Sequence, residues 1–443
     1  MNLNEDFLSL DIPLPPDIAR RKAMGDLEGA LRLIDRCLEK DLPEMAPRLR
    51  CEKIRLERLP RDYPYDRAAA MALMREEWPD MTEEQFDTLV ESGRIDWRCI
   101  HGQPHYHEDF LGSVRIYPAE APGLKQKAED HTQRNAVLRR MEEEGELTAE
   151  ITLKASIRPK VSAGGKLVQA WLPIPADCPQ QSHIEILDAT PGYQLAPADA
   201  PQRTIYWMSS ERDSFEVTYR YRHRAVFVDP MKLECAPVQP AFDTGEQRPH
   251  ITFTPYLKAL AARITEGCRT PAERAKAIYD YVTGMVDYRY QPAYLQLDPI
   301  ADTCARELRG DCGVMALLFI TLCRICGIPA RWQSGLYARP GDTGAHDWAM
   351  FYIAPHGWLY ADVSFGSSSR RNGEDWRRKH YFGSLDPWRM VANSAFQAPL
   401  TPSNPAVRHD PYDNQRGEMA VDGVGLALWE ISRSVEEVDF KLL

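Results

Sequence analysis

A cysteine at the start of an apolar run is the feature of this 443-residue chain that points most directly to chemistry. Cys312 lies between Gly310 and Gly313, and the apolar residues 314–325 predict a buried helix. Gly327 then fits the left-handed residue that follows a helix end. Cys312 is therefore expected at a helix N-terminus, where the dipole and the free N–H groups favour the nucleophilic thiolate over the thiol.

Two later polar residues complete a set of nucleophile, base and orienting group. Residues 345–353 alternate as a strand that contains His346, and residues 357–363 run back as a second strand that contains Asp362. Alternate residues of a strand share one face, so this hairpin can present both side chains together. His346 would take the thiol proton, and Asp362 would orient the imidazole and fix its tautomer. A tight turn would place Asp362 diagonal to His346, so we expect a longer turn or a bulge.

Each residue of this set also has an ordinary structural interpretation. His346 would otherwise be a hydrogen-bonded core histidine, and Asp362 would cap a turn before Ser364. A cysteine in an apolar run usually fills a core. Because His346 and Asp362 complete the set, we favour catalysis for Cys312 and keep the core interpretation for the other cysteines of this region, which are Cys304, Cys323 and Cys326.

Two metal sites are weaker interpretations. Cys323 and Cys326, with Cys304 and Cys312, have spacing that would allow zinc, but the first two fall inside a predicted helix, whereas zinc pairs usually lie on turns. The histidines His101, His105 and His107 fit a solvated hairpin edge better than a metal site. Calcium-loop spacing is also lacking in the sequence. We therefore predict no metal and no cofactor.

Four linked motifs resemble the core of the transglutaminase-like superfamily over about residues 255–370. The resemblance implies an α+β, papain-like core with Cys312 as nucleophile, His346 as base and Asp362 as orienting group. The superfamily includes crosslinking enzymes, peptidases, peptide N-glycanases and inactive members. The four motifs are residues 310–313 (GDCG), 327–331 (GIPAR), 345–348 (AHDW) and 357–362 (GWLYAD).

The remaining site residues are predicted less directly. An oxyanion needs donors, for which the Cys312 backbone N–H is one candidate and Tyr290 or Gln291 a second. Trp348 and Trp332 are candidates for the substrate cleft. The polar run 410–418 would either line the cleft or form a turn held by local hydrogen bonds, and we favour the turn.

The elements around the site suggest several domains, since a chain of this length usually forms about two to four. Residues 1–118 are predicted to be mostly helical with a small hairpin, and residues 119–146 to be a linker helix. Residues 147–232 alternate as short strands, which indicates a β-sandwich-like domain. That segment resembles the β domain often found before bacterial transglutaminase-like cores. The catalytic domain is assigned to residues 233–443.

Composition restricts partners and location. A net charge of -11 and a pI of about 5.6 argue against nucleic-acid binding, which requires a basic face. No apolar stretch reaches the roughly 18 residues of a membrane span, and the N-terminus lacks a secretory pattern. Ten scattered cysteines suit a reducing compartment, so we predict a cytoplasmic protein. The sequence does not indicate an oligomeric state.

The predicted activity is cysteine-nucleophile acyl transfer on an amide of a peptide or protein. We favour hydrolysis, as by a peptidase or amidase, because water needs no acceptor site, whereas amine crosslinking does. The alternative is a catalytically silent core that binds peptides as a scaffold.

Overall fold

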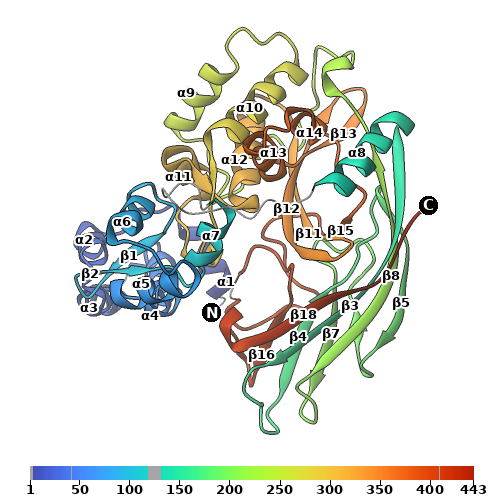
Figure 1. The fold of residues 1–443 in the computed structure, drawn as a ribbon. Coiled ribbons are helices and arrows are strands. Elements are labelled where there is room, and N and C mark those ends of the chain that lie inside the picture. Colours follow the sequence, from blue (N-terminus) through green and yellow to red (C-terminus); the bar gives the residue numbers. More distant parts are fainter. Residues whose placement is uncertain (1–2, 41, 118–130, 409) are drawn as a thin grey trace. The chain divides into compact units, whose positions relative to one another are not determined.

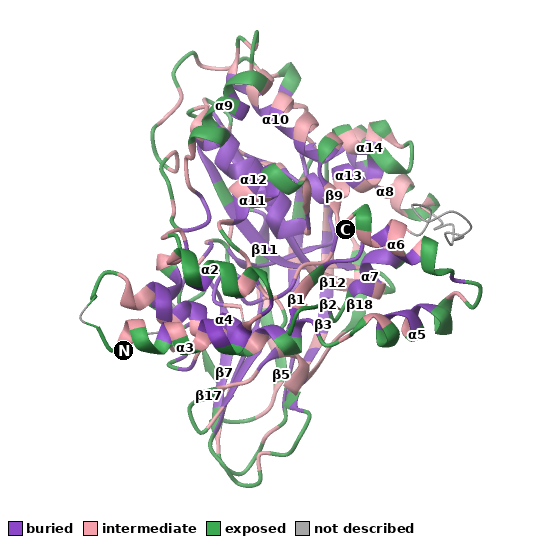
Figure 2. Cartoon of the chain, turned by 90° about the vertical axis from the view of Figure 1, so that its left-hand side faces the viewer, coloured by how far each residue is buried: buried purple, intermediate pink, exposed green. Residues whose placement is uncertain are grey.

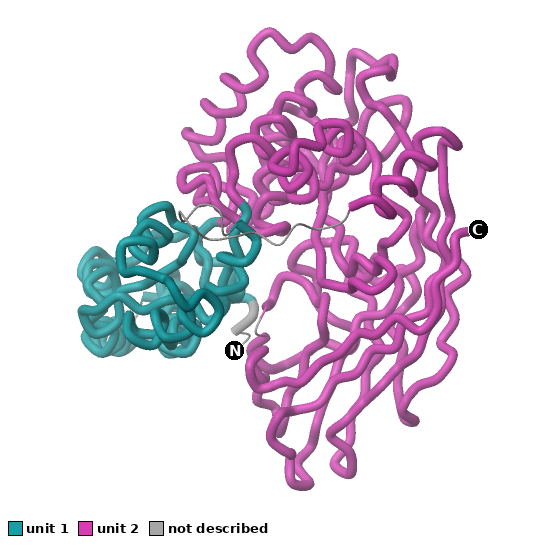
Figure 3. The backbone as a smooth tube through the Cα atoms, viewed as in Figure 1, with its two compact units in different colours: residues 1–130, 288–299 teal, residues 131–287, 300–443 magenta. Residues whose placement is uncertain are grey.

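The computed structural model describes residues 3–40, 42–117, 131–408 and 410–443 (Figure 1). It divides into two units, coloured separately in Figure 3. Unit 1 comprises residues 1–130 and 288–299, and unit 2 comprises residues 131–287 and 300–443. Residues 119–130 of the linker predicted at 119–146 lie outside the described residues, and the rest contains helix α8 (Thr132–Glu144), followed by Gly145 in the left-handed conformation.

Unit 1 is mostly helical, as its sequence predicts. Buried aliphatic and aromatic side chains form two clusters between its helices, one around Leu49 and Leu56 and the other around Phe86 and Leu89. Its helical elements are α1 (Leu3–Asp6), η1 (Phe7–Ser9), α2 (Pro16–Ala23), α3 (Leu27–Leu38), α4 (Ala46–Asp62), α5 (Arg67–Glu77), α6 (Glu83–Glu91), α7 (Phe110–Ile116) and η4 (Tyr294–Gln296).

The predicted hairpin in unit 1 is confirmed. Strands β1 (Trp97–Ile100) and β2 (Gln103–Tyr106) pair antiparallel, with Ile100 opposite Gln103. The expected solvated edge is wrong for His107, which is buried against the Tyr63 ring. This burial lowers the pKa of His107 to about 4 despite the attraction of Asp96.

Residues 288–299 fold with unit 1, although the sequence analysis assigns them to the catalytic domain. The Gln296 amide donates to the Arg55 carbonyl oxygen (3.0 Å) and to the Asp62 carboxylate (2.6 Å). The buried Arg55 guanidinium lies 2.9 Å from Asp298. These polar contacts, several of them shielded from water, hold the segment in unit 1.

Unit 2 contains a β-sandwich of two antiparallel sheets (Figure 1). It is larger than predicted, because strands near the C-terminus join both sheets: β16 pairs with β4, and β18 pairs with β3. The first sheet is β17 (Val424–Gly425), β16 (Glu418–Val421), β4 (Val168–Pro173), β7 (Thr204–Ser209) and β6 (Gln194–Leu195), and the second is β18 (Ile431–Leu442), β3 (Glu146–Pro159), β8 (Phe215–Val226) and β5 (Gln181–Ala189).

The rest of unit 2 is a five-stranded antiparallel sheet with helices, so the chain has the predicted α+β class. Leu336 and Met390 of this sheet belong to the same apolar core as the sandwich. The strand order is β14 (Phe382–Gly383), β13 (Gly357–Ala361), β12 (Asp342–Ile353), β11 (Ala330–Arg339) and β15 (Arg389–Asn393). The accompanying elements are η3 (Pro230–Lys232), α9 (Pro255–Ile264), α10 (Pro271–Met285), α11 (Ile300–Glu307), α12 (Cys312–Ile325), α13 (Val363–Arg371), α14 (Asp375–His380) and η5 (Leu428–Glu430).

Helix α12 is the central helix of this region and packs against β11 and β12. Figure 2 shows it as largely buried, in agreement with its apolar sequence. It ends at Ile325, and Gly327 follows in the left-handed conformation, as predicted. Among the described residues, none of the helices combines the length and the apolar character that crossing a bilayer requires.

Candidate active site

The Cys312 thiol stands at the first residue of helix α12. The side chain of the preceding residue, Asp311, caps the helix by accepting from the Val314 N–H at 3.0 Å. Only 9% of Cys312 is exposed. The sequence prediction that places Cys312 at a helix N-terminus is therefore confirmed.

The protonation of Cys312 differs from the expectation of a favoured thiolate. Its Sγ donates to Asp347 Oδ2 across 3.2 Å. Burial and the nearby carboxyl groups of Asp347 and Asp311 raise the pKa of the Cys312 thiol, since all three disfavour a second negative charge.

His346 and Asp362 are in direct contact. Strands β12 and β13 pair regularly, with Ile353 opposite Gly357, so the turn spans residues 354–356 and is longer than Pro355 and His356 alone, as predicted, without a bulge. Asp362 follows β13 and is diagonal to His346, yet its Oδ2 lies 2.8 Å from His346 Nε2. A diagonal pair can meet because its side chains bridge the offset between neighbouring strands.

Asp362 makes both of the contacts that the sequence left open, one with His346 and one as a cap. One oxygen, Oδ1, caps helix α13 by accepting from the Phe365 N–H at 2.9 Å and also accepts from the Ser364 hydroxyl at 3.1 Å. The other oxygen contacts His346. Burial alone would raise the pKa of Asp362, but His346 and Arg389 outweigh it and lower the pKa to about 2. The carboxylate is therefore charged at neutral pH.

Arg389 is a residue of this site that the sequence analysis missed. Its guanidinium lies 2.8 Å from Asp362 Oδ2 and 2.6 Å from Asp386, and all three side chains are buried. The only signal in the sequence is a charged residue directly before the apolar residues 390–392. A buried charge of this kind requires a partner, but the partner cannot be read from local sequence.

Aromatic rings hold the imidazole of His346. The Phe365 ring centroid lies 4.2 Å from it, and the Tyr337 ring meets it edge-on at 5.9 Å. His346 itself is only 4% exposed. Packing and the Asp362 contact therefore fix the orientation of the ring.

Asp347 connects the site to a polar segment near the C-terminus. Its second oxygen accepts from the Gln415 amide, and its carboxyl group is hydrogen-bonded to that of Asp413. Asp413 also accepts from the Ser334 hydroxyl at 2.7 Å. Local hydrogen bonds hold this segment as the favoured prediction has it, such as Gly417 N–H to Asn414, but contacts with Asp347 and Ser334 add to them. The signal in the sequence that could have indicated this connection is Asp347, an aspartate directly after His346.

The tryptophans predicted for the substrate cleft are buried. Trp348 is fully buried and donates to Gln333 at 2.7 Å, and Trp332 is 3% exposed and packs on Phe396, so neither lines an open cleft. Tyr290 and Gln291 fold with unit 1, where the Tyr290 N–H donates to a serine. The oxyanion role of these two residues stays a prediction.

No group of three or more His, Cys, Asp or Glu side chains within the described ranges is arranged to hold a metal ion. The zinc interpretation therefore gains nothing from the structure. Cys304 and Cys323 are buried as core residues, which agrees with their predicted role, and Cys326 is half-buried.

Comparison with known protein families identifies the region around these residues. The model of the transglutaminase-like superfamily matches residues 258–363. Residues 258–363 form a transglutaminase-like core. This segment contains Cys312, His346 and Asp362, whereas Arg389, Asp413 and Gln415 lie beyond it. The match supports papain-like cysteine acyl transfer in general terms.

Solved structures with related arrangements are distant. A candidate cysteine protease from Cytophaga hutchinsonii is 17% identical with a TM-score of 0.37, over 67% of this chain and 90% of that chain. The periplasmic domain of TgpA from Pseudomonas aeruginosa is 15% identical with a TM-score of 0.28, over 55% of this chain and 96% of that chain. Such distant similarities assign no activity. No curated protein sequence matches the chain.

Proposed function

We propose that the chain is a cysteine hydrolase acting on an amide bond of a peptide or protein, with Cys312 as nucleophile, His346 as general base and acid, and Asp362 as orienting group. The observation that carries the proposal is the 2.8 Å contact between His346 Nε2 and the charged Asp362. Asp347, the residue after His346 on β12, contacts the Cys312 thiol. An imidazole, an orienting carboxylate and a thiol are the groups that such a reaction requires.

The first half of the reaction forms a thioester. Asp362 occupies Nε2, so Nδ1 of His346 is the nitrogen that takes the thiol proton. The Cys312 sulfur then attacks the amide carbon, and the carbonyl electron pair moves to oxygen. When the C=O bond re-forms, the C–N bond breaks, and His346 returns its proton to the departing amine. The acyl group remains on sulfur.

The second half releases the acyl group. His346 accepts a proton from water, the hydroxide adds to the thioester carbon, and collapse breaks the C–S bond. The products are a carboxylic acid and the free thiol. The same intermediate would react with an amine to give a crosslink. We favour water because it needs no binding site of its own.

The oxyanion would be stabilised at the start of helix α12. The first N–H groups of a helix have no partner within the helix, and the Asp311 cap uses that of Val314. This leaves the Cys312 N–H for the developing negative charge, beside the positive end of the helix dipole. Removing one such donor typically costs about 10²–10³ in rate.

The test uses the full chain and a peptide mixture, with three products followed by mass spectrometry: new peptide ends, deamidated glutamines and incorporation of an amine probe. We expect the first or second product from the natural chain, and none from Cys312→Ala or His346→Ala. Cys268→Ser is the matched control, since this half-buried cysteine lies outside the site. Equal product in the natural chain and Cys312→Ala would overturn the proposal and favour the scaffold interpretation.

A further inference from the structure

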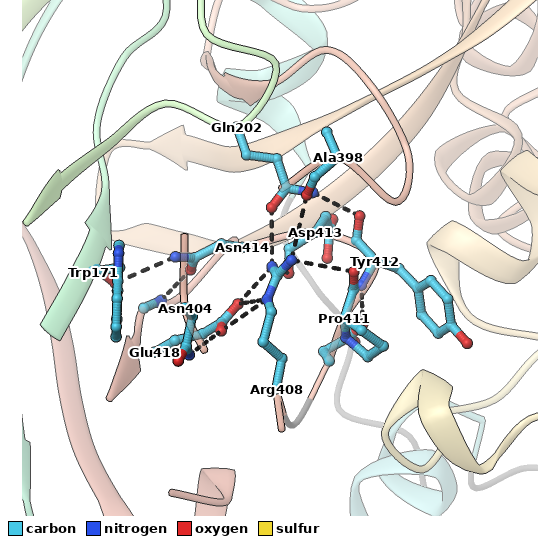
Figure 4. Close-up of polar contacts among 12 residues, drawn as sticks. Trp171, Gln202, Ala398, Asn404, Arg408, Pro411, Tyr412, Asp413, Asn414 and Glu418 are labelled. Atoms are coloured by element: carbon cyan, nitrogen blue, oxygen red, sulfur yellow. Dashed lines mark hydrogen bonds and ion pairs between the residues drawn. The ribbon is translucent and has the colours of Figure 1, made fainter. Parts of the chain in front are cut away.

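A loop beyond the transglutaminase-like core is anchored in the interior of unit 2. Arg408 precedes it, and the Arg408 guanidinium lies 2.7 Å from Glu418 and donates to Gln202 at 3.0 Å (Figure 4). The same group also donates to the carbonyl oxygens of Pro411 and Asp413, at 3.2 Å and 3.4 Å. Such a network fixes the loop backbone because each bond sets the place of a different segment.

Asn414 provides a second anchor for this loop. Its side chain accepts from the Gly417 N–H at 2.7 Å and donates to the Trp171 carbonyl oxygen at 3.3 Å. Its own carbonyl oxygen accepts from the Asn393 amide at 3.1 Å. The residues on either side, Asp413 and Gln415, are thereby held at fixed positions. Both of them contact Asp347.

The hydrogen bond between Asp347 and Asp413 requires a shared proton. Two ionised carboxylates are both acceptors, so one member of a bonded pair must carry the proton. Burial raises the pKa of both groups, and each also feels the charge of other carboxyls around it. The Ser334 hydroxyl donates to Asp413 and favours negative charge on that member. With one proton between them, the pair carries one negative charge over two residues.

The Cys312 thiol donates a hydrogen bond to Asp347 Oδ2, an oxygen of this pair. In the described part of the chain, no hydrogen bond joins Cys312 to His346. A thiolate at this position would lie beside the negative charge of the pair. Holding that charge farther from sulfur, on Asp413, makes the thiolate less unfavourable.

We propose that Asp347 and Asp413 are positioning residues that share a proton beside Cys312 and thereby set the pH range in which its thiol becomes a nucleophile. This inference rests on the proposed function, because it concerns the same nucleophile. Asp347 acts on the sulfur directly, by accepting a hydrogen bond from the thiol. Asp413 acts through Asp347, by taking part of its charge. The loop at 410–417 is thus part of the site.

Other charged groups near the thiol act on the same equilibrium. Asp311 caps the nucleophile helix, His346 precedes Asp347, and Asp410 lies near Asp413. Behind them, Arg408 pairs with Glu418 and attracts charge toward Asp413. These groups are unchanged by substitutions at Asp347 or Asp413, so the two carboxyls can be tested separately.

The proposal predicts opposite effects for two isosteric substitutions. Asp347→Asn removes the part of the negative charge that lies next to sulfur, so the thiol should ionise more readily. Asp413→Asn removes the shared proton and leaves the whole charge on Asp347, so the thiol should ionise less readily. A change of one unit in the thiol pKa would alter the thiolate fraction about tenfold. A structural defect alone would move both variants in the same direction.

The experiment is the iodoacetamide labelling rate of Cys312 in the full chain from pH 5 to 9, read by peptide mass spectrometry with Cys268 as internal reference. We expect labelling near neutral pH to rise about tenfold in Asp347→Asn and to fall severalfold in Asp413→Asn. If Asp413→Asn does not fold, Ser334→Ala is the substitute. It removes the hydroxyl that stabilises negative charge on Asp413, so it should also slow labelling of Cys312.

Shifts of equal sign in the Asp347 and Asp413 variants, or no shift in either, would overturn the inference. The labelling reaction needs no amide substrate. Opposite shifts without any amide turnover would therefore reject the proposed function and support the shared proton. Amide turnover without the shifts would support the proposed function and reject the shared proton.

Discussion

Arg389 lies 2.8 Å from the same Asp362 oxygen that contacts His346 Nε2. One carboxylate oxygen thus serves an imidazole and a guanidinium together, with no exposure to water for either Asp362 or Arg389. Because the arginine is always charged, it keeps Asp362 ionised whether or not His346 carries a proton. The orienting group of the proposed reaction therefore depends on a residue outside the superfamily match.

Asp362→Asn should reduce both stability and activity. It leaves Arg389 with one buried partner and removes the negative charge that stabilises protonated His346. We expect a loss of roughly 3–5 kcal/mol in the free energy of unfolding and about 10²–10⁴ in turnover. Asp386→Asn is the matched control, because it also removes a charge from Arg389 but keeps the His346 contact. Equal loss of turnover per folded molecule in both variants would contradict an orienting role for Asp362.

Gly335 should tolerate no side chain. It lies opposite His346 on β11, and a Cβ there would meet the Met390 carbonyl oxygen and lie 2.9 Å from the Ala392 nitrogen. Gly335→Ala would push β15 away from β11 and should cost about 3 kcal/mol. Gly284→Ala is the control, since its Cβ meets nothing within 4 Å in helix α10, and it should stabilise by about 0.5–1 kcal/mol. Urea unfolding would measure both, and similar midpoints for the two variants would contradict the steric argument.

The parts of the site that sequence predicted are those with a local signature. The helix start at Cys312 and the glycine after its end could be read from neighbouring residues, as could the strands of His346 and Asp362. The sequence also predicted a turn longer than Pro355 and His356, and the observed turn contains Ala354 as well. The contact between His346 and Asp362 is nevertheless diagonal.

The parts that sequence missed depend on contacts between distant segments. Strand β18 pairs with β3 from the far end of the chain, and residues 288–299 leave the catalytic region to fold with unit 1. Asp413 and Gln415 reach Asp347 only because Arg408 anchors their loop on other strands. Periodicity and turn chemistry report on neighbours along the chain, so they carry no information on such pairing.

Unit 1 should lose stability in acid through Glu52. This buried carboxylate lies 2.6 Å from Lys22, 2.8 Å from Arg48 and 2.9 Å from Arg55. Burial alone would raise the pKa of Glu52, but the three cations lower it from 4.5 to about 2. A depressed pKa gives stability that is complete above pH 4.5 and is lost as pH falls toward 2, here on the order of 3 kcal/mol.

Peptide-resolved hydrogen exchange of residues 3–117 between pH 5 and 2 would measure this loss. Glu52→Gln should show faster exchange already at pH 5 and a flatter dependence on pH, because the group that titrates is gone. The control is Glu28→Gln, whose exposed pair with Arg32 at 3.6 Å should contribute little. An unchanged pH dependence in Glu52→Gln would show that another group is responsible.

Arg408→Lys tests whether the anchored loop supports the nucleophile. A lysine keeps the charge but cannot bond Glu418 with two nitrogens while also reaching the carbonyl oxygens of Ala398 and Pro411. We expect a loss of about 2–4 kcal/mol in stability and slower labelling of Cys312, because Asp413 would no longer be held against Asp347. Arg416→Lys, an exposed position in the same loop, should change neither quantity. If Arg408→Lys lowers stability while the Cys312 labelling profile stays unchanged, then the anchor serves the fold alone and Asp413 keeps its contact without it.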